Sequence, residues 1–97
     1  MIRLSKKDFR RWLVKRKRVI VGVAESPCGC AFHGYLKWRG ARSIRIQIKN
    51  RLVDGKFHRH NQWQRDFQIE AMKLEGELDV IGLRGREALA VLDGLDL

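Results

Sequence analysis

The feature that most constrains the fold of this 97-residue chain is a strict alternation of isoleucine with polar residues between positions 43 and 49. Ile44, Ile46 and Ile48 fall on one side of an extended chain, because successive side chains of a β-strand point to opposite faces. The other side carries Arg45, Gln47 and Lys49. The segment is therefore predicted to form a strand with one buried face and one basic, solvent-facing face.

A helix is predicted over residues 5–17. Ser5, followed three residues later by Asp8, is typical of a helix N-terminus, where side-chain oxygens accept hydrogen bonds from free backbone N–H groups. Apolar side chains then recur at the spacing of one helical face, namely at Phe9, Trp12 and Leu13.

The following segments predict a strand and a second helix. Residues 19–24 (Val-Ile-Val-Gly-Val-Ala) form a short apolar run that favours a buried strand. Ser26-Pro27 predicts a helix start, since serine caps and proline suits the first helical position. An apolar stripe at helical spacing follows, made of Cys28, Ala31, Phe32, Tyr35 and Leu36. Gly40 suits a left-handed helix end. Strand, helix and strand in this order suggest a β-α-β unit, and whether the two strands pair in parallel stays open.

The second half of the chain predicts a hairpin and two helices. Asp54-Gly55 is typical of a hairpin turn between residues 52–53 and 56–57. Residues 61–75 are ambiguous, because their apolar positions fit both a helix and an alternating strand. Helix is favoured, since Asn61 is a good N-cap and the helical stripe extends over several turns, at Trp63, Phe67, Ala71, Leu74 and Leu78. A last short helix is predicted over residues 86–95, led by Gly85.

These elements predict a small α+β fold, with a two- to three-stranded sheet packed against about four short helices. Their order is helix, strand, helix, strand, hairpin, helix, helix. We expect residues 1–97 to form one domain, which suits the chain length, and the 44% hydrophobic content suffices for a modest core. No apolar run reaches the roughly 20 residues that cross a bilayer, and the N-terminus is too charged for a signal peptide. We therefore expect a soluble cytoplasmic protein with no membrane partner.

Charge is divided unevenly along the chain. Residues 1–65 hold eighteen Lys and Arg against three acidic residues, whereas residues 66–97 hold three Lys and Arg against eight acidic residues. A positive field confined to one part of a small protein is typical of a polyanion binder, because neutralised phosphates release counterions. The acidic C-terminal third could instead face the basic part of a neighbouring copy, which suggests a possible homodimer.

Aromatic residues lie among the cations, as in proteins that hold single-stranded nucleic acid by phosphate contacts and base stacking. The phosphate contacts predicted from the first helix and its end are Arg10, Arg11, Arg16, Lys17 and Arg18. Those predicted further along the chain are Lys37, Arg39, Arg45, Lys49, Arg51 and Arg59, and the candidate stacking platforms are Trp38 and Trp63. The chain has no ribonucleoprotein motif, no Gly-x-x-Gly clamp, no zinc-finger spacing and no catalytic signature.

The sequence therefore predicts a non-enzymatic, nucleic-acid-associated protein of bacterial or phage type. It would bind the phosphate backbone of RNA or DNA with little sequence preference. The alternative is an accessory or inhibitor protein that docks on an acidic surface of a larger protein or ribonucleoprotein. The order Phe-x-x-Trp-Leu, a Val/Ile strand, Ser-Pro-Cys-x-Cys and a final Glu-Ala-Leu-x-x-Leu helix is similar to that of short bacterial proteins, and it implies no activity or site residue.

A third alternative uses the thiol and imidazole groups of Cys28, Cys30, His33, His58 and His60. Zinc prefers such ligands, but Cys-x-Cys-x-x-His matches no structural zinc pattern, so we expect no cofactor, with zinc as the one possibility. A thiol function would need a reactive cysteine. Cys30 lies off the apolar stripe that contains Cys28, so it is expected to be the more exposed and reactive of the two. A buried, inert cysteine is the simpler interpretation.

Overall fold

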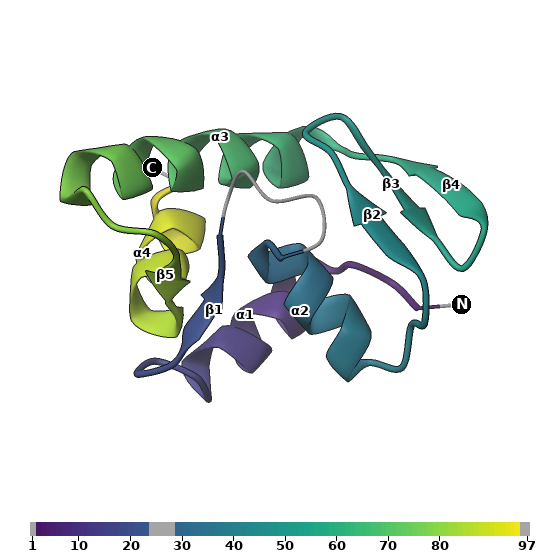
Figure 1. Cartoon of the computed structure of the whole chain (residues 1–97), viewed down its shortest axis with the longest axis horizontal. Coiled ribbons are helices and arrows are strands. Elements are labelled where there is room, and N and C mark those ends of the chain that lie inside the picture. The colour runs from purple at the N-terminus through teal and green to yellow at the C-terminus, as the bar shows by residue number, and fades with distance from the viewer. Residues whose placement is uncertain (1, 24–28, 96–97) are drawn as a thin grey trace.

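The computed structural model describes residues 2–23 and 29–95, and its α+β architecture confirms the predicted fold class (Figure 1). None of the helices in these residues is long and apolar enough to cross a membrane. The elements of the described chain follow in the order α1 Lys6–Val14, β1 Ile20–Gly22, α2 Ala31–Trp38, β2 Ile44–Ile46, β3 Asn50–Val53, β4 Lys56–Arg59, α3 Gln62–Leu78, β5 Leu83–Arg84 and α4 Gly85–Gly94.

The predicted alternating strand is β2, the first strand of an antiparallel sheet with order β2-β3-β4. Ile44 and Ile46 are buried as predicted, but Ile48 is exposed, so its predicted inward position is wrong. The reason is that the strand ends at Ile46. The chain then reverses in a tight turn, in which the N–H of Gln47 donates to the carbonyl of Asn50 at 2.9 Å.

The hairpin turn at Asp54-Gly55 is confirmed between β3 and β4. Both residues have positive φ angles, 49° and 81°. Positive φ at both central residues is characteristic of the two-residue hairpin turn whose backbone matches the twist of the flanking strands. The Asp54 carboxylate also accepts hydrogen bonds from the N–H groups of Arg42 and Ser43, at 2.9 and 2.8 Å. These bonds fix the start of β2 beside the turn.

The predicted strand at residues 19–24 is the three-residue β1, and it joins a second, two-stranded antiparallel sheet with β5. Because β1 and β2 belong to different sheets, the suggested β-α-β pairing is not formed. The predicted burial of this run is also wrong at Val19 and Ile20, which are exposed. Among the described residues β1 pairs with only one short strand, so part of the run stays open to solvent.

Helix α1 begins where predicted, with Ser5 as N-cap, and its Oγ accepts a hydrogen bond from the N–H of Asp8 at 3.2 Å. The helix ends at Val14 rather than near residue 17, because the N–H of Arg16 bonds back to Leu13 in a tight turn. The predicted inward face is confirmed, since the buried side chains of α1 are Phe9, Trp12 and Leu13.

Helix α2 begins at Ala31 with Cys30 as N-cap, later than predicted. The predicted start at Ser26-Pro27 and the stripe position Cys28 lie outside the described residues. The rest of the stripe is confirmed as buried: Ala31, Phe32, Tyr35 and Leu36. Gly40 has φ 107° and ends the helix as predicted, because the N–H of Ala41 reaches back to the carbonyl of Leu36 at 3.1 Å.

The ambiguous segment 61–75 is helical, as favoured, and α3 continues to Leu78. Asn61 and Gln64 form a reciprocal capping box, in which each side chain accepts a hydrogen bond from the other residue's backbone N–H, at 3.2 and 2.9 Å. The last predicted helix is confirmed as α4, whereas β5 just before it was not predicted.

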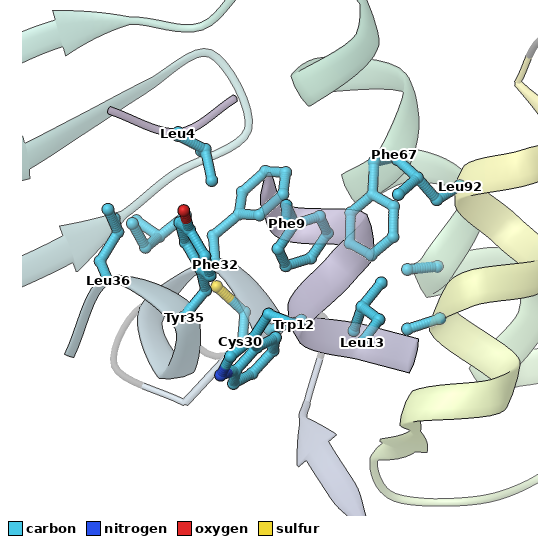
Figure 2. Close-up of a cluster of buried hydrophobic side chains, with 14 of the residues drawn as sticks. Leu4, Phe9, Trp12, Leu13, Cys30, Phe32, Tyr35, Leu36, Phe67 and Leu92 are labelled. Carbon is cyan, nitrogen blue, oxygen red and sulfur yellow. The ribbon is translucent and has the colours of Figure 1, made fainter. Parts of the chain in front are cut away.

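The core lies between the helices and the inward side of β2 and β3, and its largest fully buried side chains are aromatic (Figure 2). Phe9 of α1 packs edge-on against Phe32 of α2 and Phe67 of α3, with ring centroids 5.0 and 5.2 Å apart. Such contacts add to the burial of apolar area. The three-stranded sheet lies at the right of Figure 1, and its inward side chains Ile44, Ile46 and Val53 join the core. Side chains on its other face, such as Leu52 and Phe57, are exposed.

Candidate nucleic-acid interface

One face of the β2-β3-β4 sheet packs inward and the other is open, because side chains alternate along each strand. Arg45, Leu52 and Phe57 are paired in register across the three strands, and all three are exposed. Asn50 and Arg59 are paired in the next row outward. We call this face, with its neighbouring cations, the Phe57 surface; it consists of Arg45, Lys49, Asn50, Leu52, Phe57, Arg59 and Arg65.

The centre of the Phe57 surface is apolar. The Phe57 side chain is 63% exposed and Leu52, directly opposite on β3, is 44% exposed. Phe57 takes part in none of the ring–ring or cation–ring contacts found in residues 2–23 and 29–95. Its ring therefore has a face that another flat ring can cover.

The cations gather at the edge of this apolar centre. A hollow of about 380 Å³ is lined by Lys49, Asn50, Phe57, Arg59 and Arg65. Three of these five residues are cations and none is a carboxylate. Arg65, on α3, is held at the hollow because its guanidinium donates to the carbonyl of His60 at 2.7 Å and to the side-chain oxygen of Gln62 at 3.2 Å. The hollow thus joins an exposed ring to three cations that make no ion pair with a described carboxylate.

Arg51 lies on the other face of the same sheet. It shares the inward side of β3 with Val53 and is 8% exposed, so it is not beside Arg45 and Arg59 on the open face. Burial lowers the pKa of its guanidinium, and its Nε and Nη1 atoms are buried without a hydrogen-bond partner. Arg51 was predicted to contact phosphate together with Arg45 and Lys49, but the two-residue period places it on the inward side, away from the open face.

The two histidines of β4 and its end also lie toward the inner side. His60 is buried, and its Nδ1 donates to the carbonyl of Ile48 at 2.9 Å, since a carbonyl can only accept. Burial lowers the pKa of both His60 and His58, and the charge of Arg51 lowers each further. Both rings are thus held neutral, and the positive charge of the Phe57 surface comes from arginine and lysine.

A second group of cations and rings lies where α1 meets the end of α2. We call it the Trp38 surface: Arg11, Lys15, Arg16, Trp38 and Arg39. Trp38 is 58% exposed, but the Arg16 guanidinium lies against it, 5.1 Å from the ring centroid, and 4.7 Å from that of Trp12. Arg16 also donates to the carbonyl of Trp12 at 3.1 Å. A small pocket of about 90 Å³ nearby includes the carboxylate of Asp8.

Of the other predicted phosphate contacts, Arg10 has its side chain tied into the fold, whereas Lys17, Arg18 and Lys37 are exposed. Arg10 makes a two-pronged ion pair with Asp93 of α4, at 2.9 and 3.1 Å. The backbone carbonyl of Lys17 accepts a hydrogen bond from the N–H of Arg86, and that of Arg18 accepts one from the guanidinium of Arg84. The side chains of Lys17 and Arg18 are nevertheless exposed. Lys37 is exposed at the end of α2. These cations are spread over several elements rather than gathered around one free ring.

Trp63, the second predicted stacking platform, belongs to the edge of the core. Its ring is partly buried and lies 6.2 Å from Phe9 and 5.7 Å from Phe32, centroid to centroid. It therefore has packing partners within the fold, unlike Phe57.

The predicted thiol and metal residues that the structure describes do not converge on one site, and Cys28 lies outside the described residues. Cys30 is buried, so the expectation that its side chain is exposed is wrong. As the N-cap of α2 it turns into the core, where the amide nitrogen of Gln68 lies 3.7 Å from its Sγ. Burial raises the pKa of its thiol, which disfavours the reactive thiolate. Within residues 2–23 and 29–95, no three His, Cys, Asp or Glu side chains, His33 and His58 included, are grouped to hold a metal ion.

The sequence drew attention to the cations of the Phe57 surface but not to its centre. Leu52 and Asn50 were not singled out, and the larger rings of Trp38 and Trp63 were preferred to Phe57 as platforms. The available signal was the alternation of residues 50–59, which puts Leu52 on the same face as Arg45. Comparisons with family models, curated proteins and solved structures found no match for this chain.

Proposed function

We propose that this protein binds single-stranded nucleic acid, without catalysing a reaction, through the Phe57 surface. The observation that carries the proposal is a 63% exposed phenylalanine, without a ring or guanidinium partner among the described residues, on the open face of the sheet and beside a hollow lined by three cations. Proteins that bind single strands commonly combine exposed rings, on which bases stack, with a positively charged groove that follows the nucleic-acid backbone. The role fits a cytoplasmic protein.

In this proposal the ring of Phe57 and the side chain of Leu52 hold the face of an unpaired base. Arg45, Lys49 and Arg59 contact the phosphates on either side of that base. Every base has a π-face and every nucleotide a phosphate, so such contacts discriminate little between sequences. A duplex offers its phosphates but keeps its bases stacked in the helix, so it cannot use the apolar centre.

The test is a salt titration of binding to labelled single-stranded RNA, single-stranded DNA and duplex DNA of one sequence, from about 50 to 300 mM monovalent salt. We expect the single strands to bind more tightly than the duplex, with a log–log slope of roughly 0.7 for each phosphate contacted. No binding at the lowest salt, or equal binding of duplex and single strands, would overturn the proposal.

Charge-reversed variants make the test specific to the surface. Arg59→Glu should weaken binding to single strands and lower the salt slope by at least one contact, about 0.7. Arg86→Glu is the matched control, because Arg86 is an exposed cation on α4, at the opposite end of Figure 1 from the sheet. Equal losses in the two variants would show that net charge, rather than the Phe57 surface, governs binding.

A further inference from the structure

A groove between α3 and α4 is acidic, whereas the Phe57 surface is basic. It has a volume of about 630 Å³, and its rim carries the carboxylates of Asp66, Glu70 and Glu77, all from α3. Its floor is apolar, made of Leu74 of α3 with Val91 and Leu95 from α4 and its end, all partly buried against the core.

The charge of this groove is negative in a protein whose formal net charge is +10. Its one lysine, Lys73, is engaged by Glu70 at 3.2 Å, which leaves Asp66 and Glu77 unopposed by any other cation of the groove lining. An apolar floor with an acidic rim fits an occupant that offers exposed apolar side chains ringed by cations.

The chain itself carries such an occupant. The Phe57 surface has two exposed apolar side chains, Phe57 and Leu52, and four surrounding cations without a carboxylate. In Figure 1 the sheet lies at one end of the long axis, and α4 lies at the other. One molecule therefore cannot bring its own two surfaces together, but two molecules placed end to end can.

We infer that the α3–α4 groove of one molecule receives the Phe57 surface of a second copy. The two contacting patches differ, so the association is head-to-tail and leaves a free groove at one end and a free Phe57 surface at the other. It extends to further copies rather than closing as a symmetric dimer. Because charge attraction contributes, the association weakens as salt screens it.

This inference shares the Phe57 surface with the proposed function but does not depend on nucleic-acid binding. If both the inference and the proposed function hold, an oligonucleotide competes with the second copy for the same residues. Binding of single strands should then dissociate the assembly.

The test is a mixing experiment on two variants at about 50 mM salt, followed by sedimentation velocity. Glu70→Lys with Glu77→Lys reverses the groove but keeps the Phe57 surface. Phe57→Glu blocks the Phe57 surface but keeps the groove. All three positions are exposed, so the fold is expected to survive, as thermal unfolding of each variant would show.

We expect the wild type to form a concentration-dependent series of oligomers. Each variant alone should sediment as a monomer of 11.4 kDa, and their equimolar mixture should form a species of twice that mass. Lys7→Glu, an exposed charge reversal on α1, serves as a control and should associate like the wild type. A mixture that stays monomeric, or a variant that self-associates alone, would overturn the inference. Neither result requires nucleic acid, so failure here is distinct from failure of the proposed function.

Discussion

The Phe57 surface and the Trp38 surface both place arginines beside an exposed ring, yet the two regions differ in what already occupies the ring. At the Trp38 surface, the Arg16 guanidinium lies against Trp38 and Trp12, 5.1 and 4.7 Å from their ring centroids. At the Phe57 surface, no described ring or guanidinium contacts Phe57 in this way. The comparison teaches that a mixture of cations and aromatics does not by itself identify a ring that is free to stack, because the packing around each ring decides that.

The difference has a structural cause. The turn at residues 15–18 is fixed between α1 and the start of α4, because the N–H groups of Gly85 and Arg86 donate to the carbonyls of Val19 and Lys17. A side chain on Gly85 would collide with the backbone of Arg16. The fixed position of this turn therefore places the Arg16 guanidinium against the rings of Trp12 and Trp38. On the open face of β4, Phe57 is 63% exposed, and within the described part of the chain no ring or guanidinium lies over it.

The largest expected effect comes from removing each ring in turn. Phe57→Ala should weaken binding to single strands by about 1 to 3 kcal/mol, or roughly 5- to 150-fold, because one base loses its stacking partner. Trp38→Ala should change affinity less than about 3-fold, because Arg16 already covers a face of that ring. Fluorescence anisotropy with a labelled single strand measures both. A larger loss in Trp38→Ala than in Phe57→Ala would reverse the comparison.

The next effect concerns stability rather than binding. Arg16→Ala removes the contacts with two tryptophan rings and the bond to the carbonyl of Trp12. The free energy of unfolding should therefore fall by about 1 to 2 kcal/mol, measured by urea denaturation. The exposed Phe57→Ala should change it by less than about 0.5 kcal/mol. Equal stability of the two variants would show that the Trp38 surface is not a structural element.

A smaller effect should follow from enlarging the free ring. Phe57→Trp offers more stacking area and a ring that binds cations well, so affinity for single strands should rise a few-fold, within the roughly 1 kcal/mol that separates such rings. Leu52→Ala, the matched change beside it, should lower affinity slightly. Isothermal titration calorimetry distinguishes these two directions. A loss of affinity in Phe57→Trp would argue against base stacking at this position.

The smallest expected effect is that of pH, which should change stability more than binding. Burial lowers the pKa of His60 and His58 in the folded protein, so below about pH 6.5 the unfolded chain binds more protons than the folded one. Stability should therefore fall as the pH drops from 7 to 5, and less steeply in His60→Phe. Affinity should stay level between pH 7 and 8.5, because the Phe57 surface contains no histidine. Urea titrations and anisotropy at each pH check both statements.

Elements specified by neighbouring residues were predictable from the sequence. The Asp54-Gly55 turn, the Asn61 cap and the buried stripe of α2 each depend on local spacing, and each is confirmed. The start of α2 was placed too early, because Ser26-Pro27 is a strong local signal while the helix observed has Cys30 as its cap. Because Cys30 is the N-cap of the observed helix and turns into the core, it is buried where exposure was expected.

Features set by distant contacts were not predictable in the same way. β5 is two residues long and exists through its pairing with β1, more than sixty positions earlier, so no local pattern announces it. The position of Arg16 between two tryptophans depends equally on how α1 and α2 meet. The inward side of Arg51 was visible in the alternation with Val53, but a buried arginine contradicts the usual rule that charged side chains face water.

The most direct measurement is ultraviolet cross-linking of the wild-type protein to a bound single-stranded oligonucleotide, followed by mass spectrometry of the digested complex. The account predicts that the cross-linked nucleotides lie on the peptide that contains Phe57, within β4. Cross-links confined to residues 11–18 or 37–39 would contradict it, because the Trp38 surface would then be the binding site and the free ring on the sheet would have no part in holding the strand.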